Sequence, residues 1–245
     1  MIKLAYIMTP ILFGISLWQG VVWLTDVPQF ILPSPWRVAQ TGWEYRRLIL
    51  ENALVTGPEV ALGLVLGTVL GALTAILLAS SQRLHRLVMP LLILTQAIPV
   101  FALAPILTLW LGYGIASKVM MALLIIFFPV TSAFFDGLSR IPSGFADLAQ
   151  TMGGTKWQIM RHIRIPHAIP SLGTGLKLAA VYAPIGAVIG EWVGASQGLG
   201  YLMLLANGRA KTDLMFASLL CLCLFATLLY SAVSLVSDGL SRDER

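Results

Sequence analysis

The sequence predicts an all-α membrane protein that crosses the bilayer several times. Of its 245 residues, 58% are hydrophobic and 11% are charged, whereas a soluble domain carries about 25% charged residues. The apolar residues gather in several runs that reach the roughly 20 residues a helix needs to cross the hydrocarbon core. Because that core holds no water, each run must satisfy its own backbone hydrogen bonds, and a helix does so. A barrel would need alternating segments of about 10 residues, and the sequence does not have that pattern.

Six membrane-spanning helices are expected, at residues 4–24, 58–80, 87–111, 117–136, 172–193 and 213–237. The first run follows a lysine, as a signal peptide would, but it is long for one and no A-x-A-like cleavage site follows it. We therefore expect it to remain as a span. The mixed segment 25–56 is either an amphipathic helix at the membrane surface or a solvated connector. This divides the chain into 1–57, the first helix with a periplasmic amphipathic segment, and 58–245, the main transmembrane domain.

The net charge of +5 reflects membrane topology, because the Lys and Arg residues lie in the segments between apolar runs. Cytoplasmic segments carry the excess of Lys and Arg. With the N-terminus inside, ten of the sixteen fall on the cytoplasmic side and six on the other, so both termini are expected in the cytoplasm. The short loop 81–86 is the clearest local signal. We expect membrane lipid around the chain and no nucleic acid.

Small residues indicate how the spans pack. Two stripes repeat every four residues, one at Gly63, Gly67, Gly71 and Ala75 and one at Gly186, Gly190 and Gly194. Such stripes let helix backbones approach closely in lipid. Cys221 and Cys223 lie in one apolar run and are expected to be core residues. The sequence has no cluster of metal-ligand type, so no metal or cofactor is expected.

The segment 143–170 predicts two short helices outside the bilayer. Gly153-Gly154 ends the first, because glycine accepts the positive φ found at helix C-termini. Thr155 and Gln158 have capping-box spacing for the start of the second, and Pro166 is expected to end it. One apolar stripe runs along the second helix, made of Trp157, Met160 and Ile163. Such a helix either docks into a groove on another protein or lies on the inner leaflet.

A family resemblance favours the first alternative. The stretch 147–153, followed by Ile163-Arg164-Ile165-Pro166, resembles the EAA loop of binding-protein-dependent ABC permeases: Glu-Ala-Ala, three residues, Gly, nine residues, Ile-x-Leu-Pro. Asp147, Leu148 and Ile165 depart mildly from that pattern. In the family the loop forms coupling helices that sit in a cleft of the ATPase. The resemblance implies the type I ABC importer permease fold and a coupling role for Asp147, Ala149, Gly153, Trp157, Arg161, Ile163 and Pro166.

Further stretches resemble particular branches of this family. Ile98-Pro99, Ala102, Pro105, Trp110, Gly112, Gly114 and Lys118 resemble the sulfonate, nitrate and taurine permeases. Residues 182–196 and 198–201 resemble permeases for hydroxymethylpyrimidine-type thiamine precursors. The resemblance implies a bacterial inner-membrane homodimer that works with two ATPase subunits and a periplasmic substrate-binding protein. A thiamine-precursor pyrimidine is the expected cargo, with sulfonate, taurine or nitrate as the alternative.

The energy source is expected on another chain. A phosphate-binding P-loop needs a Gly-Lys pair, and none of the five lysines follows a glycine. No catalytic residue is expected either, since Asp136 has no acidic or nucleophilic partner within the spans. We therefore expect a transport subunit and not an enzyme. The remaining alternative is a secondary transporter or channel, which typically shows inverted repeats or interrupted spans.

Four residues are candidates for the translocation pathway: Pro99, Pro105, Pro184 and Glu191. Prolines within spans free backbone carbonyls, and these are tolerated where helices pack or line a cavity. A charge at membrane depth usually faces a protein interior or a cavity. For Glu191 the alternatives are lining the outer end of the pathway, binding a neighbouring loop, or a purely structural hydrogen bond.

Overall fold

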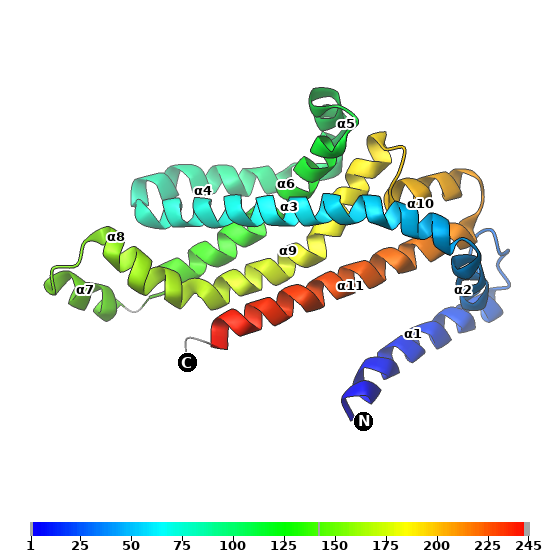
Figure 1. Cartoon of the computed structure of the whole chain (residues 1–245), viewed down its shortest axis with the longest axis horizontal. Coiled ribbons are helices and arrows are strands. Elements are labelled where there is room, and N and C mark those ends of the chain that lie inside the picture. Colours follow the sequence, from blue (N-terminus) through cyan, green and yellow to red (C-terminus); the bar gives the residue numbers. More distant parts are fainter. Residues whose placement is uncertain (1, 142, 243–245) are drawn as a thin grey trace.

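The computed structural model describes residues 2–141 and 143–242, and this part of the chain is helical throughout its regular structure (Figure 1). The elements are α1 (Ile2–Thr25), α2 (Pro35–Glu44), α3 (Arg46–Ser80), α4 (Gln82–Ala97), α5 (Val100–Leu111), α6 (Ile115–Ser139), α7 (Ser143–Thr151), α8 (Lys156–Ile159), the π-helical turn η1 (Met160–Arg164), α9 (Ile165–Gly194), α10 (Leu199–Gly208) and α11 (Thr212–Arg242).

Four long helices form the bundle, and each contains one predicted span. Helices α3, α6, α9 and α11 run along the long axis of the molecule, with α6 packed between α3 and α9 (Figure 1). All four are long and apolar enough to cross a membrane, which confirms the spans predicted at 58–80, 117–136, 172–193 and 213–237. Helix α3 begins earlier than expected, at Arg46, so the expected domain boundary at 57/58 lies inside it.

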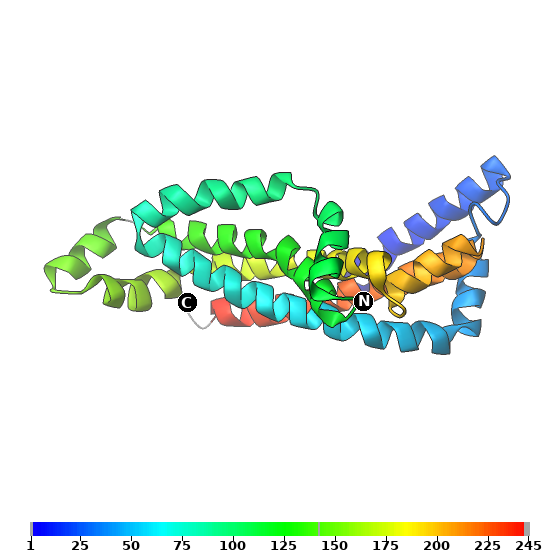
Figure 2. The ribbon, with the colours of Figure 1, turned by 90° about the horizontal axis from the view of Figure 1, so that it is seen from above.

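The span predicted at 87–111 is not one continuous helix, because the chain bends by 97° between α4 and α5. Pro99 has no N–H for the helical ladder, and its ring disfavours the helical conformation at Ile98. Ile98 is accordingly extended, with ψ 122°. Helix α5 then turns across the bundle and packs on α6 and α9 (Figures 1 and 2).

The prediction of a loop at 81–86 is wrong, since Ser81 alone separates α3 from α4. Its hydroxyl accepts a hydrogen bond from the Leu84 N–H and so caps α4 at once. With α4 and α5 counted as one broken span, five spans meet the length and composition needed. A sixth would be α1, which lies apart from the bundle (Figure 1) and reaches it through Trp18, whose ring packs on Phe216 at 5.5 Å.

Both glycine stripes lie at helix contacts, as predicted. A Cβ on Gly63 would come within 2.5 Å of the Ala122 Cβ, and one on Gly67 would meet Ile126 at the same distance. From α9, a Cβ on Gly186 would collide with the Ala122 backbone. Helices α3 and α9 therefore approach α6 more closely than any larger residue would permit.

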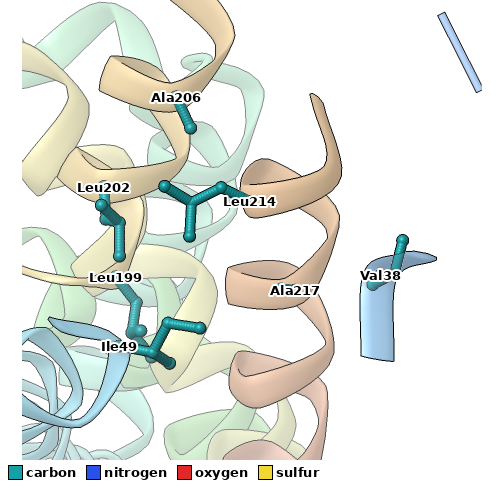
Figure 3. Close-up of a cluster of buried hydrophobic side chains, with 7 residues drawn as sticks. All are labelled: Val38, Ile49, Leu199, Leu202, Ala206, Leu214 and Ala217. Carbon is teal, nitrogen blue, oxygen red and sulfur yellow. The ribbon is translucent and has the colours of Figure 1, made fainter. Parts of the chain in front are cut away.

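The segment 25–56 contains a helix, α2, and is not simply a connector. Ser34 caps it and Pro35 occupies its first turn, where a missing N–H costs nothing. Val38 of α2 is buried in a cluster with residues of α3, α10 and α11. Figure 3 shows this cluster, in which Leu199 lies beside Ile49, and Leu202 and Leu214 lie nearer Ala206. It fixes the end of the bundle farthest from α7 and α8 (Figure 1).

Candidate functional site

The turn between α7 and α8 follows the glycine break predicted from the sequence. Gly153 has φ +85°, a conformation that costs glycine little. The Gly153 N–H donates to the Gln150 carbonyl at 2.9 Å and the Gly154 N–H donates to the Ala149 carbonyl at 2.8 Å. This pair of bonds satisfies carbonyls that the end of a helix would leave free. Local sequence therefore closes α7 without help from the bundle.

The predicted capping box at the start of α8 is confirmed. The Gln158 N–H donates to the Thr155 hydroxyl at 3.3 Å, and the Thr155 N–H donates to the Gln158 side-chain oxygen at 2.8 Å. The two residues thus satisfy each other's backbone donors. The direction of α8 relative to the preceding turn is set by these contacts.

Pro166 does not end the second helix, and that prediction is wrong. The helical backbone runs without a break from Lys156 to Gly194. Directly before the proline, the chain widens into the π turn η1, in which the Ile165 N–H reaches back five residues to the Met160 carbonyl. A π turn absorbs one extra residue, and here it accommodates the missing N–H and the bulk of the proline ring. The α7–α8 loop is therefore joined rigidly to α9.

The predicted stripe on the second helix does not form one surface. Met160 is buried against Phe134, Leu138 and Ala168 of the bundle, whereas Trp157 is exposed. Residues three apart on a helix drift by about 60° around its axis, so a three-residue repeat soon turns away from one face. Met160 consequently anchors the loop to the bundle and is not available to a partner.

An exposed apolar surface lies instead on α7. Phe145, Leu148 and Met152 are 61%, 58% and 80% exposed, and their spacing of three and four residues places them on one side of α7 and of the turn that directly follows it. We call these three residues the α7 face. Trp157, 61% exposed, adds a fourth large apolar side chain beyond the turn. This spacing is a signal that the sequence itself carries.

The structure brings together some of the predicted coupling residues. Ala149, Gly153 and Ile163 line one cavity of about 410 Å³ between α7 and η1. Pro166 is half-buried where η1 joins α9. The side chains of Asp147 and Arg161 are exposed. Their contact with an ATPase stays a prediction.

At the opposite end of α9, Glu191 makes a network of hydrogen bonds. The carboxylate is 1% exposed. Its Oε1 accepts from the Thr56 hydroxyl at 2.6 Å, and its Oε2 accepts from the N–H groups of Gly200 at 2.5 Å and Tyr201 at 3.2 Å. Glu191 thus joins α9 to α3 and to the first turn of α10. Hydrogen bonds to an ionised acceptor are roughly twice as strong as neutral ones.

The remaining donors at the start of α10 are satisfied by α3. The Gly198 N–H donates to the Asn52 side-chain oxygen and the Leu199 N–H to the Thr56 hydroxyl, both at 2.8 Å. Gly198 has φ +119°, and a Cβ there would overlap the Glu191 carboxylate. We call Asn52, Thr56 and Glu191, with the four backbone N–H groups of 198–201, the α10 cap. It replaces the local side-chain cap that a helix usually carries.

A second buried pair lies one turn farther along α3. The Lys118 ammonium on α6 is 3.4 Å from Glu59 Oε1 and donates to the Tyr113 carbonyl at 3.4 Å. Burying one charge alone would be costly, and pairing offsets that cost. Each member lies within a predicted span, but they are far apart in the chain, and one sequence does not show that they meet.

The four pathway candidates lie in different environments. Pro184 is buried in α9, whereas Pro99 and Pro105 are exposed at the start of α5 and within it. Glu191 is bound in the α10 cap. A role in lining the pathway stays a prediction for all four. Across residues 2–141 and 143–242, no group of three or more His, Cys, Asp or Glu side chains is arranged to hold a metal ion.

Comparison with known proteins identifies the family. Residues 67–242 match the model of the binding-protein-dependent transport system inner membrane component. The chain belongs to this family of ABC transporter permeases, which are multi-pass membrane proteins that serve as transport subunits. Its partners are accordingly an ATP-binding-cassette ATPase and a substrate-binding protein.

Three relatives cover most of the chain. A probable ABC transporter permease protein of Haemophilus influenzae is 46% identical, over 89% of this chain and 89% of its own length. The formylaminopyrimidine transport permease protein ThiX of Halalkalibacterium halodurans is 38% identical, over 83% and 82%. The riboflavin transport system permease protein RibX of Chloroflexus aurantiacus is 35% identical, over 93% and 85%. Permeases for aliphatic sulfonates and taurine are more distant relatives.

The fold matches that of a solved importer. The inward-facing MetNI methionine ABC transporter superposes with a TM-score of 0.71 over 80% of this chain and 98% of that one, at 20% identity. This likeness places the chain in the type I ABC importer permease fold, as the sequence predicted.

Proposed function

We propose that this chain translocates a small polar solute across the bacterial inner membrane by alternating access, driven by ATP hydrolysis on a separate subunit. The observation that carries the proposal is the continuity of the α7–α8 loop with α9. The loop presents the exposed α7 face, and its second helix runs on through the bundle without a break. An apolar helix face suits docking into a groove on a partner. In this proposal Asp147, Ala149, Gly153, Trp157, Arg161, Ile163 and Pro166 couple the permease to the ATPase.

The cargo is proposed to be a thiamine-precursor pyrimidine. Support comes from the resemblance of residues 182–196 to permeases of that kind and from the similarity to ThiX, which is named for formylaminopyrimidine. Riboflavin, sulfonate, taurine and nitrate are the competing cargoes. The test is to measure binding of each compound to the partner binding protein, then uptake into proteoliposomes. Selective binding and uptake of a compound other than the pyrimidine would overturn this assignment.

The working unit is proposed to be a homodimer with both termini in the cytoplasm. Support comes from large apolar side chains on the broken helix α4–α5, including Leu91, Phe101, Leu109 and Trp110, which this chain leaves exposed. A second copy would cover part of that surface. Mass measurement of the purified complex tests the dimer. Cysteine labelling from either side of the membrane, at Gln197 and Lys156, tests the orientation.

A secondary transporter or channel makes the opposite prediction about energy. Proteoliposomes carrying the chain with its ATPase and binding protein should import cargo only when ATP is present on the cytoplasmic side. Collapsing ion gradients with an ionophore should leave the rate unchanged. Import that persists without ATP and stops with the ionophore would contradict the ABC importer assignment for this chain.

A further inference from the structure

One unbroken helix connects the α7–α8 loop to the α10 cap. It runs for 39 residues from Lys156 to Gly194, which at helical rise is about 58 Å. That length exceeds the roughly 40–45 Å of a bilayer with its headgroups. The loop at one end and the cap at the other are therefore two ends of a single rod. A displacement applied to α8 is passed along a continuous helical backbone, in which the π turn η1, Pro170 and Pro184 are the positions where such helices bend.

The cap fastens the far end of this rod to a separate element. Glu191 binds the N–H groups of Gly200 and Tyr201, and α10 continues into α11 through a short connection. Buried backbone donors that lose their acceptor cost about 1–3 kcal/mol each. Glycine at 198 and 200 also lets the backbone close tightly on the carboxylate, with no room for a Cβ at 198. Helix α10 therefore does not separate freely from α9.

A helix start that only needed capping would not require this arrangement. A local Ser, Thr, Asp or Asn at the N-cap supplies an acceptor without burying a charge, yet the N-cap here is Gly198. The chain instead uses a carboxylate from α9, which is desolvated and attracted by the positive end of the α10 dipole. An acceptor on α9 has the consequence that α10 moves when α9 moves.

We propose that Glu191 is a positioning residue that transmits ATPase-driven movement of α8 and α9 to α10 and to the exposed loop at 195–197. Movement of the coupling end thereby reshapes the opposite face of the permease. This inference rests on the proposed ATPase coupling through the α7–α8 loop, and its test separates the two.

The test places a spin label at each end of the rod in the assembled transporter. Labels go on Lys156→Cys and Gln197→Cys, both exposed positions, in a chain whose Cys221 and Cys223 are replaced by Ala. Spectra are recorded with and without a non-hydrolysable ATP analogue. In the parent both labels should respond. In Glu191→Leu, which is of similar size but has no acceptor for the Gly200 and Tyr201 amides, only the label at 156 should respond.

Glu51→Leu is the matched control, because it makes the same chemical change at an exposed position of α3 and should leave both responses intact. Co-purification of the ATPase with Glu191→Leu establishes that the complex is assembled, and the proposal is overturned if the label at 197 still responds in that complex. A parent in which 197 responds and 156 does not would overturn the coupling role of α8 together with this inference.

A second pair of variants guards against misfolding of the glutamate variant. Thr56→Val removes the hydroxyl that Glu191 and the Leu199 N–H share, whereas Thr56→Ser retains it. ATPase stimulation by loaded binding protein should fall about tenfold in Thr56→Val, as expected for one lost bond to a charged group, and should remain within about twofold of the parent in Thr56→Ser. Equal stimulation in the two variants would contradict the proposal.

Discussion

The two ends of the helix bundle differ in which side chains they expose and which they bury. At the α7–α8 end, large apolar residues such as Leu148 and Met152 lie exposed. At the α10 end, the charged Glu191 is buried and every N–H of the first turn of α10 has an acceptor. We call the first end incomplete, because no described part of this chain covers its large apolar side chains, and the second end complete, because its backbone donors find acceptors within the chain. Under the proposed function, the first end receives the force of the ATPase and the second end holds its shape while it passes that force on.

The largest expected effect is at the complete end. Gly198→Ala adds a Cβ that overlaps the Glu191 carboxylate at a backbone φ of +119°. Strain and overpacking together should lower the free energy of unfolding by roughly 2–6 kcal/mol. Thermal unfolding of the purified permease in detergent measures this loss. Gly208→Ala, at the other end of α10 with open space around it, is the control, and equal stability of the two variants would refute the tight cap.

A smaller effect is expected from the glycine at the incomplete end. Gly153→Val meets no neighbour within 4 Å, but its φ of +85° is unfavourable for a β-branched residue by about 1–3 kcal/mol. The turn should distort and transport should fall at least about tenfold, while the ATPase still co-purifies. Gly144→Val, also in open space but without positive φ, should transport at the parent rate. A normal rate in Gly153→Val would count against the coupling role of the turn.

The α7 face itself should matter for assembly and not for folding. Met152→Glu places a charge on the most exposed member of the face and should weaken ATPase binding by about 1–2 kcal/mol, or roughly tenfold in Kd. Thr151→Glu, one residue away and also exposed, is the control. The affinity of detergent-solubilised permease for its ATPase, measured by titration, would show no difference between these variants if α7 lay on lipid.

The smallest effect is expected at Asp147. Its side chain is exposed, and an exposed charge contributes about 0.2–1 kcal/mol to an ion pair. Asp147→Lys should therefore weaken ATPase binding only about two- to fivefold, and the difference should shrink as salt is raised. Co-purification that matches the parent at low ionic strength would remove Asp147 from the interface.

Features decided by neighbouring residues were predictable from the sequence. The Thr155 and Gln158 capping box and the turn at Gly153 depend on contacts within a few residues, and the four long spans follow from apolar length alone. The bend at Pro99 was missed because prolines within spans are often tolerated, and whether one bends the chain depends on what packs against it. Pro166 was misjudged because a π turn, which has no simple sequence signal, accommodates it.

The α10 cap was beyond prediction for a different reason. Its contacts join residues distant in the chain, such as Asn52 and Gly198, which are 146 positions apart. Glu191 was singled out as a charge at membrane depth, but one sequence does not reveal which of several elements it meets. Thr56 gave no signal, because it is an ordinary polar residue before the predicted span 58–80, whereas Glu59 is a charge within that span and carries the same kind of signal as Glu191.

The capping of α10 from outside also bears on how the chain is made. Synthesis proceeds from the N-terminus, so Asn52, Thr56 and Glu191 all leave the ribosome before residues 198–201. When the first turn of α10 emerges, its acceptors already exist on α3 and α9. The N–H groups of this turn can therefore bind their acceptors as they form and need not lie unsatisfied in lipid, which would be costly. The order of the helices along the chain thus matches an order of insertion in which α3 and α9 precede α10, and α11 follows it.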